Sequence, residues 1–159
     1  MKVNYSKSAK EKEIAVFIFS QKKLKNALAQ ELAEIKKTIE QEKFEAKEET
    51  SVFLPTGFKG FKRALFLGTG EMPDKEKVRR ATASAIKFCQ QKKIETVSFF
   101  VPEFDTTKKG DCALAVVEGA ILANYSFQKY KTVKEDKKTF VKEIELIADL
   151  SEKEKQECD

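Results

Sequence analysis

Apolar residues fall into short runs and helical stripes that alternate along the chain. Residues 14–19 read IAVFIF, a β-branched and aromatic run that predicts a central strand covered on both faces. Beyond it, apolar residues separated by Lys, Gln and Glu recur at Leu24, Leu28, Leu32, Ile35 and Ile39. Their spacing of three or four residues predicts an amphipathic helix over residues 23–42.

A second strand-to-helix unit follows. Residues 51–54 predict a brief strand closed by Pro55, and residues 64–67, ALFL, predict a buried strand that runs into the Gly68-Thr69-Gly70 turn. Asp74 then suits the N-cap of a helix. The apolar stripe of that helix comprises Val78, Ala81, Ala85 and Phe88.

The last third of the chain predicts one more unit and a final strand. Residues 97–101 predict a strand, and residues 111–129 predict a helix that is apolar almost all round and rich in small residues, so it should be the most buried helix. Residues 140–147 predict a strand near an edge, because Lys142 and two glutamates interrupt it. This alternation predicts a three-layer α/β/α fold with a mixed, largely parallel sheet and helices on both faces.

The amino-acid composition excludes several catalytic mechanisms. The chain has 159 residues, enough for one domain with a real core, and it contains no histidine. Ser-His-Asp, Cys-His and HExxH mechanisms are therefore excluded. Three cysteines stand far apart without a zinc or redox spacing, so disulfides are not expected; they are Cys89, Cys112 and Cys158.

The charge and hydropathy of the chain indicate which kinds of partner to expect. The net charge is +5, but the basic residues are mainly lysines scattered among Glu and Asp, a pattern that favours a solvated surface over nucleic-acid binding. No run approaches the length of a membrane span, and residues 1–12 lack the apolar stretch of a secretory signal. We therefore expect a cytoplasmic protein with neither membrane nor nucleic acid as a partner.

The sequence contains two candidate sites, one for a phosphate and one for a metal ion. The Gly68-Thr69-Gly70 turn lies where backbone N–H groups can cradle a phosphate, but the third glycine of a dinucleotide fingerprint is missing and Glu71 follows, so a simple tight turn is favoured. Five carboxylates near strand ends offer oxygen ligands, but no spacing unites them; they are Glu71, Asp74, Asp105, Asp111 and Glu118. We therefore predict no catalytic, cofactor-binding or metal-binding residue in this chain.

Ser151 and Glu154 match the S/T-x-x-E capping box, which predicts a new helix there. The alternative is a frayed polar tail. The boundary divides the chain into a domain over residues 1–150 and a short helical segment over residues 151–159.

A family resemblance is carried by residues 118–132, EGAILANYSFQKYKT. This segment resembles the EG-x-x-L-x-x-Y-x-F-x-x-Y-K-T signature that closes the N-terminal domain of the leucyl aminopeptidase family, also called the cytosol aminopeptidase or M17 family. Upstream, LFLGTGE at residues 65–71 and TVSFFVPE at residues 96–103 follow in the family's order. The matching signature positions, read as structural, are Glu118, Gly119, Leu122, Tyr125, Phe127, Tyr130 and Lys131.

The resemblance implies a macro-domain-like fold for residues 1–150 and the start of a linker helix at residues 151–159. It also implies a parent protein whose separate catalytic domain holds two divalent metals, zinc or manganese, in a homo-hexamer that removes N-terminal residues from peptides. The family's NTDAEGR motif and its catalytic lysine and arginine segment are absent from this sequence. The chain should therefore be inactive alone and contribute to assembly and active-site access.

Two alternatives stay open. A free-standing macro-like module would bind ADP-ribose or another nucleotide, with the Gly68 turn as its phosphate loop. The lysine surface offers DNA binding instead, which the resemblance also allows because some family members bind DNA.

Overall fold

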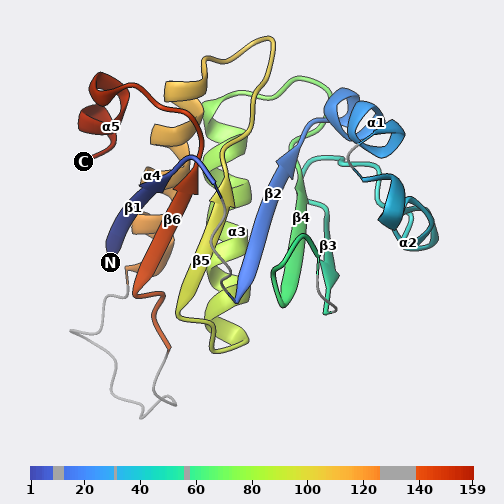
Figure 1. Ribbon diagram of the computed structural model, residues 1–159, viewed down its shortest axis with the longest axis horizontal. Coiled ribbons are helices and arrows are strands. Elements are labelled where there is room, and N and C mark those ends of the chain that lie inside the picture. Colours follow the sequence, from blue (N-terminus) through green and yellow to red (C-terminus); the bar gives the residue numbers. More distant parts are fainter. Residues whose placement is uncertain (9–12, 31, 56–57, 126–138) are drawn as a thin grey trace.

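The computed structural model describes residues 1–8, 13–30, 32–55, 58–125 and 139–159. Within these ranges the chain forms a six-stranded sheet in the order β1-β6-β5-β2-β4-β3 (Figure 1). Every neighbouring pair is parallel except β3 with β4, which confirms the α/β class and the mixed, largely parallel sheet. The strands are β1 (Lys2–Ser6), β2 (Ile14–Phe19), β3 (Ser51–Leu54), β4 (Arg63–Gly68), β5 (Thr96–Phe100) and β6 (Glu143–Ile147).

Helices cover both faces of this sheet. One face packs against α3 and α4, and the other packs against α1, a 3₁₀ turn η1 and α2 (Figure 1). In the described part of the chain, no helix has the length and apolar character needed to cross a membrane. The helical elements are α1 (Gln21–Ala29), η1 (Ala33–Ile35), α2 (Lys36–Gln41), α3 (Lys75–Gln91), α4 (Lys109–Asn124) and α5 (Glu152–Cys158).

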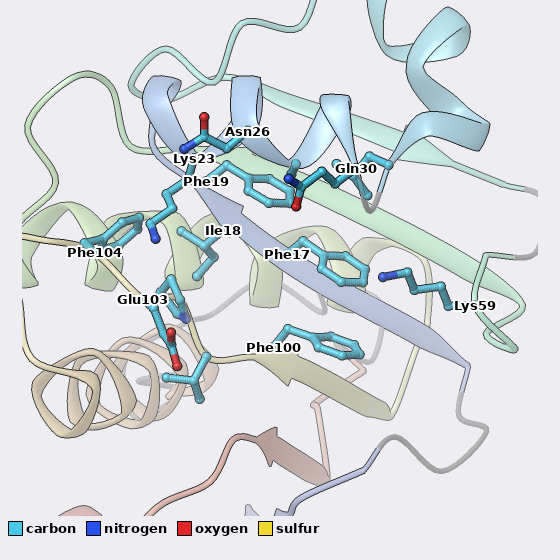
Figure 2. A pocket seen from close by; sticks show the side chains of 14 residues that line it. Phe17, Ile18, Phe19, Lys23, Asn26, Gln30, Lys59, Phe100, Glu103 and Phe104 are labelled. Atoms are coloured by element: carbon cyan, nitrogen blue, oxygen red, sulfur yellow. The ribbon is translucent and has the colours of Figure 1, made fainter.

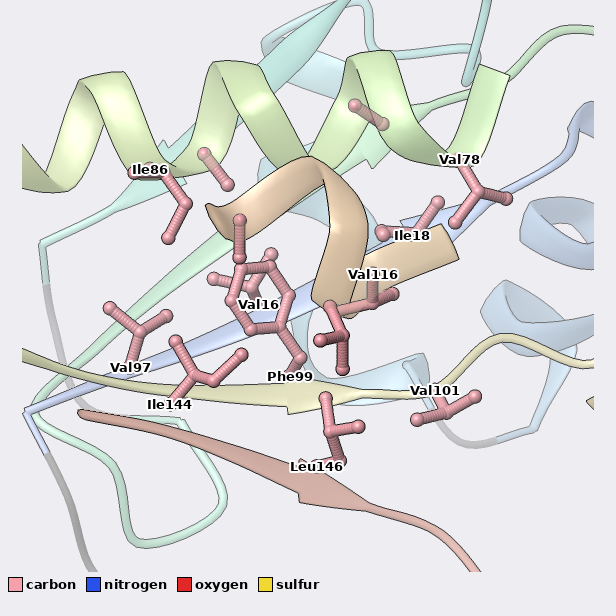
Figure 3. Close-up of a cluster of buried hydrophobic side chains, with 14 of the residues drawn as sticks. Val16, Ile18, Val78, Ile86, Val97, Phe99, Val101, Val116, Ile144 and Leu146 are labelled. Atoms are coloured by element: carbon pink, nitrogen blue, oxygen red, sulfur yellow. The ribbon is translucent and has the colours of Figure 1, made fainter. Parts of the chain in front are cut away.

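Strand β2 is central, as its apolar run predicts, because it pairs with β4 on one side and β5 on the other. Alternate side chains of a strand point to opposite faces. Ile14, Val16 and Ile18 accordingly join the core cluster beneath α3 and α4 (Figure 3), while Ala15 and Phe17 join the cluster beneath α1 and α2.

The single helix predicted over residues 23–42 is wrong. Helix α1 leaves α-helical geometry at Gln30, whose N–H donates to the Ala27 carbonyl, and the chain resumes as η1 and α2. Neither proline nor glycine lies in this stretch. Leu24, Leu32 and Ile39 are all buried in the same cluster. The apolar pattern is therefore continuous in sequence, but packing against the sheet interrupts the helix.

The last strand lies near an edge, as predicted, but it is not the edge strand itself. Strand β6 lies between β5 and β1, and β1 forms the edge. Glu145 was a reason to expect an edge, but it is buried and accepts a hydrogen bond from the Ser98 hydroxyl at 3.2 Å. Ile144 and Leu146 fill the core on the opposite face of the strand (Figure 3). Strand β1 was not predicted, because its five residues are mostly polar.

The helix starts are confirmed. The Asp74 carboxylate accepts a hydrogen bond from the Lys77 backbone N–H at 2.8 Å and caps α3. Ser151 and Glu154 form the reciprocal capping box at the start of α5. Helix α4 begins two residues before its predicted start at residue 111, and its predicted continuation to residue 129 lies outside the described residues.

Candidate functional site

The Gly68-Thr69-Gly70 turn is a packed turn. The N–H groups of all three residues donate to backbone carbonyls at 2.9 Å, the acceptors being Thr50, Phe19 and Ala46. A Cβ on Gly68 would lie 2.2 Å from the Lys47 carbonyl oxygen, so the loop before β3 fills the space around the turn. The backbone donors of the turn are thus used within the fold, as expected for a tight turn.

The candidate carboxylates are dispersed into separate contacts. In the described ranges, no group of three or more His, Cys, Asp or Glu side chains is arranged to hold a metal ion. The hydrogen bond and charge of Lys22 lower the pKa of Asp105, as expected for an ion pair on the surface. Glu71 is exposed. The remaining three carboxylates each have a different partner: Asp74 accepts from the α3 backbone, Asp111 pairs with Lys75 at 2.9 Å, and Glu118 pairs with Arg79 at 2.5 Å.

The signature segment starts on α4, where it ties α4 to α3. Glu118 accepts a hydrogen bond from Nε of Arg79, and Glu76 accepts a second one from the same guanidinium at 3.3 Å. The bond to Glu118 is the largest cause of a raised pKa for Arg79. The guanidinium is thus held between two carboxylates in a fixed orientation.

Gly119 sets how closely the two helices approach. A Cβ at this position would lie 2.6 Å from the Arg79 carbonyl oxygen and 3.1 Å from Cβ of Thr82. Only a residue without a side chain allows this contact, so the glycine of the signature has a packing role.

A polar contact that the sequence did not reveal holds the end of α4. The side-chain amide of Asn124 donates to the Val141 carbonyl at 2.8 Å and accepts from the Val141 N–H at 2.9 Å. Its oxygen also accepts from the Gln90 amide at 3.1 Å. The last turn of α4 is therefore anchored both to α3 and to the segment before β6.

Three large apolar side chains on this anchored turn are exposed. Ile121 is 51% exposed, Leu122 71% and Tyr125 72%. Residues three and four apart adjoin on a helix, so these three form one surface, here named the α4 patch. Leu122 and Tyr125 are signature positions, while Phe127, Tyr130 and Lys131 lie outside the described residues. Helix α4 has more buried residues than any other described helix, as predicted, but its last turn is exposed.

The α4 patch suits protein recognition better than chemistry. Monomeric proteins rarely leave contiguous large apolar side chains in water, and such surfaces mark contacts with other protein elements. Tyr is enriched in these contacts because its ring buries area while its hydroxyl stays wet. Among the described residues, no group of three or more His, Cys, Asp or Glu side chains at this surface is arranged to hold a metal ion.

Comparisons with known proteins show which family the chain belongs to. The sequence profile described as "Cytosol aminopeptidase family, N-terminal domain" matches residues 15–134. A probable cytosol aminopeptidase of Aquifex aeolicus is 34% identical over 145 residues, which is 87% of this chain and 29% of that protein. One from Protochlamydia amoebophila is 30% identical over 109 residues, covering 66% of this chain and 22% of that protein.

The fold has a matching solved structure. A mutant of tomato leucine aminopeptidase superposes with a TM-score of 0.80 at 14% identity, covering 99% of this chain and 34% of the tomato chain. The chain thus spans roughly a third or less of the length of each protein that it matches.

Proposed function

Because the chain belongs to the cytosol aminopeptidase family and corresponds to its N-terminal domain, we propose that it is the non-catalytic part of a metal-dependent leucyl aminopeptidase. The larger protein removes N-terminal residues from peptides. This domain contributes assembly and access to the active site, and the α4 patch is its contact surface. The observation that carries the proposal is the exposure of Leu122 and Tyr125, two signature positions on an otherwise anchored helix.

The rest of the proposal concerns the parent protein. Residues 1–150 form the domain, and α5, within residues 151–159, begins the linker to a catalytic domain with two divalent metals, zinc or manganese. The parent works in the cytoplasm as a homo-hexamer. Support comes from relatives more than three times as long as the matched part and from the absence of histidine in this chain.

The test is a chimera in which this chain replaces the matching part of the Aquifex aeolicus relative. We expect the chimera to assemble and to hydrolyse leucine p-nitroanilide with Mn²⁺ or Zn²⁺, while the isolated chain does not. Replacing Leu122 and Tyr125 together by Asp places charge in the contact, and we expect assembly or turnover to fall about tenfold or more. Light scattering and initial rates measure the two quantities.

Met72→Asp is the matched control, because Met72 is 70% exposed and lies outside the α4 patch. It should leave mass and turnover unchanged. Metal-dependent turnover by the pure isolated chain would contradict the non-catalytic role. A double variant that behaves like the Met72→Asp control would contradict the role of the patch.

A further inference from the structure

A cavity of about 520 Å³ lies at the carboxyl ends of β2 and β5, between α1 and the segment that follows β5 (Figure 2). In the sheet, β2 lies between β4 and β5. The chain first passes from β2 towards β4 and then returns across β2 to β5, so the strand order reverses at β2. The crevice where strand order reverses in this way is the usual ligand position in open α/β sheets. The volume is in the range of small-molecule sites.

The floor of the cavity is aromatic. Phe17 and Phe100 are register partners on neighbouring strands, and their rings are nearly parallel at 13° with centroids 4.4 Å apart. Phe19 lies two residues further along the same face of β2, with its ring nearly parallel to that of Phe17. Phe19 and Phe100 remain partly exposed in the cavity, although burial would stabilise both. A flat apolar group can therefore lie against these rings.

One wall is a polar stripe of α1. Lys23, Asn26, Ala27 and Gln30 line the cavity at helical spacings of three and four residues, so they share one face of the helix. In the described structure, no side-chain hydrogen bond or ion pair engages Lys23, Asn26 or Gln30. Three polar groups at one concave wall are thus available to a ligand.

The residues that line the cavity carry a net positive charge, with Lys23 and Lys59 against Glu103, and the charge of Lys23 also contributes to the lowered pKa of nearby Asp105. Lys59 approaches the rings from the side opposite Lys23 and carries its ammonium 5.5 Å from the centre of the Phe58 ring (Figure 2). Glu103, the acidic residue of the lining, is paired with Lys109, and nearby Asp105 is paired with Lys22. The two lysines of the lining therefore favour an anionic ligand group.

We propose that this cavity binds a small aromatic acid, with its ring on Phe17, Phe19 and Phe100 and with its carboxylate or phosphate attracted by the positive charges of Lys23 and Lys59 on the two sides of the rings. The amides of Asn26 and Gln30 orient the polar part of the ligand. The site shares no residue with the α4 patch. Binding at the cavity can therefore be tested independently of the aminopeptidase role.

The direct test is a titration of the ¹⁵N-labelled chain with 3-phenylpropionate, followed by ¹H–¹⁵N correlation spectra. We expect saturable shifts at α1 and at the ends of β2 and β5, with a Kd below about 1 mM. The neutral analogue 3-phenylpropanol should bind about fivefold more weakly, because it forms no ion pair. Phenyl phosphate, titrated in parallel, distinguishes a carboxylate from a phosphate as the preferred anion.

Matched variants locate the site. Lys23→Gln and Lys59→Gln should each weaken 3-phenylpropionate about twofold to fivefold, the range of a partly exposed ion pair. Lys25→Gln is the control, because Lys25 is exposed on the same helix and does not line the cavity. Ala27→Phe fills the cavity and should abolish binding, and its own spectrum shows whether the fold is kept.

Three results would overturn the proposal. They are the absence of saturable shifts at 10-fold the expected Kd, equal affinity for the acid and the alcohol, and equal weakening by Lys23→Gln and Lys25→Gln. The first result would mean that the cavity does not bind this class of ligand. The second would mean that binding depends on apolar contact alone and not on the charge. The third would mean that anions are attracted by the general positive surface and not by a defined site.

Discussion

The first turns of α4 and its last turn consist of the same kinds of residue, yet they meet opposite surroundings. Cys112, Val116 and Ala120 are fully buried, whereas Leu122 and Tyr125 are among the most exposed large side chains of the described structure. Apolar composition decides that a helix needs cover on all sides. Which element provides that cover is decided by the rest of the fold.

The difference lies on the side of α4 that faces away from the sheet. At the start of the helix this side is covered by α5, where a Cβ on Gly110 would lie 2.8 Å from the Glu154 carboxylate. At the end of the helix, the described structure places no element over Leu122 and Tyr125. This uncovered turn is the contact surface of the proposed function, where a second protein surface would complete the layer.

The largest expected effect separates two isoleucines. Ile86 on α3 is fully buried in the core, while Ile121 in the α4 patch is 51% exposed. Ile86→Ala should lower the free energy of unfolding by roughly 3 kcal/mol, because it removes core contacts and leaves a cavity. Ile121→Ala should change it by less than about 0.5 kcal/mol. Urea unfolding followed by circular dichroism measures both, and similar losses for the two variants would mean that the patch is covered within the chain.

A smaller effect separates two glycines of the same helix. Gly119→Ala brings a methyl group against the backbone of α3, so we expect a loss of about 2 kcal/mol from overpacking. Gly110→Ala meets only the flexible side chain of Glu154, and the better helix propensity of alanine offsets that contact to within about 1 kcal/mol. The same urea experiment compares them. If Gly119→Ala unfolds at the urea concentration of the unchanged protein, the close helix contact does not exist in solution.

The smallest effect on stability comes with a large effect on reactivity. Burial raises the pKa of the Cys112 thiol to about 11, so at pH 8 the thiol is protonated as well as covered. A cysteine introduced by Leu122→Cys stands in solvent on the same helix and should react with a disulfide reagent at least about tenfold faster. Mass spectrometry of timed samples gives both rates. Equal rates would show that the buried and exposed turns of α4 open together.

Part of the candidate site could be inferred from the sequence, because the signature segment pointed to α4. The contacts of two signature positions could not be inferred: Glu118 pairs with Arg79 and Gly119 leaves room for α3, and both partners are far away in the sequence. The exposure of Leu122 could not be inferred, because a leucine in an apolar helix has the same local pattern whether covered or not. The cavity was equally invisible, since Phe17, Lys59 and Phe100 come from three separate segments.

The sequence by itself determined the strands with uninterrupted apolar runs and the helix starts at Asp74 and Ser151. These depend on side-chain pattern and on hydrogen bonds that span three residues. Only the tertiary structure decided that β1 lies at the edge of the sheet beside β6, that the first helix breaks near Gln30, and that Leu122 and Tyr125 are exposed within the described part of the chain. The physical reason is that strand neighbours, helix breaks and exposure depend on free energies of contact between distant segments, which no local pattern contains.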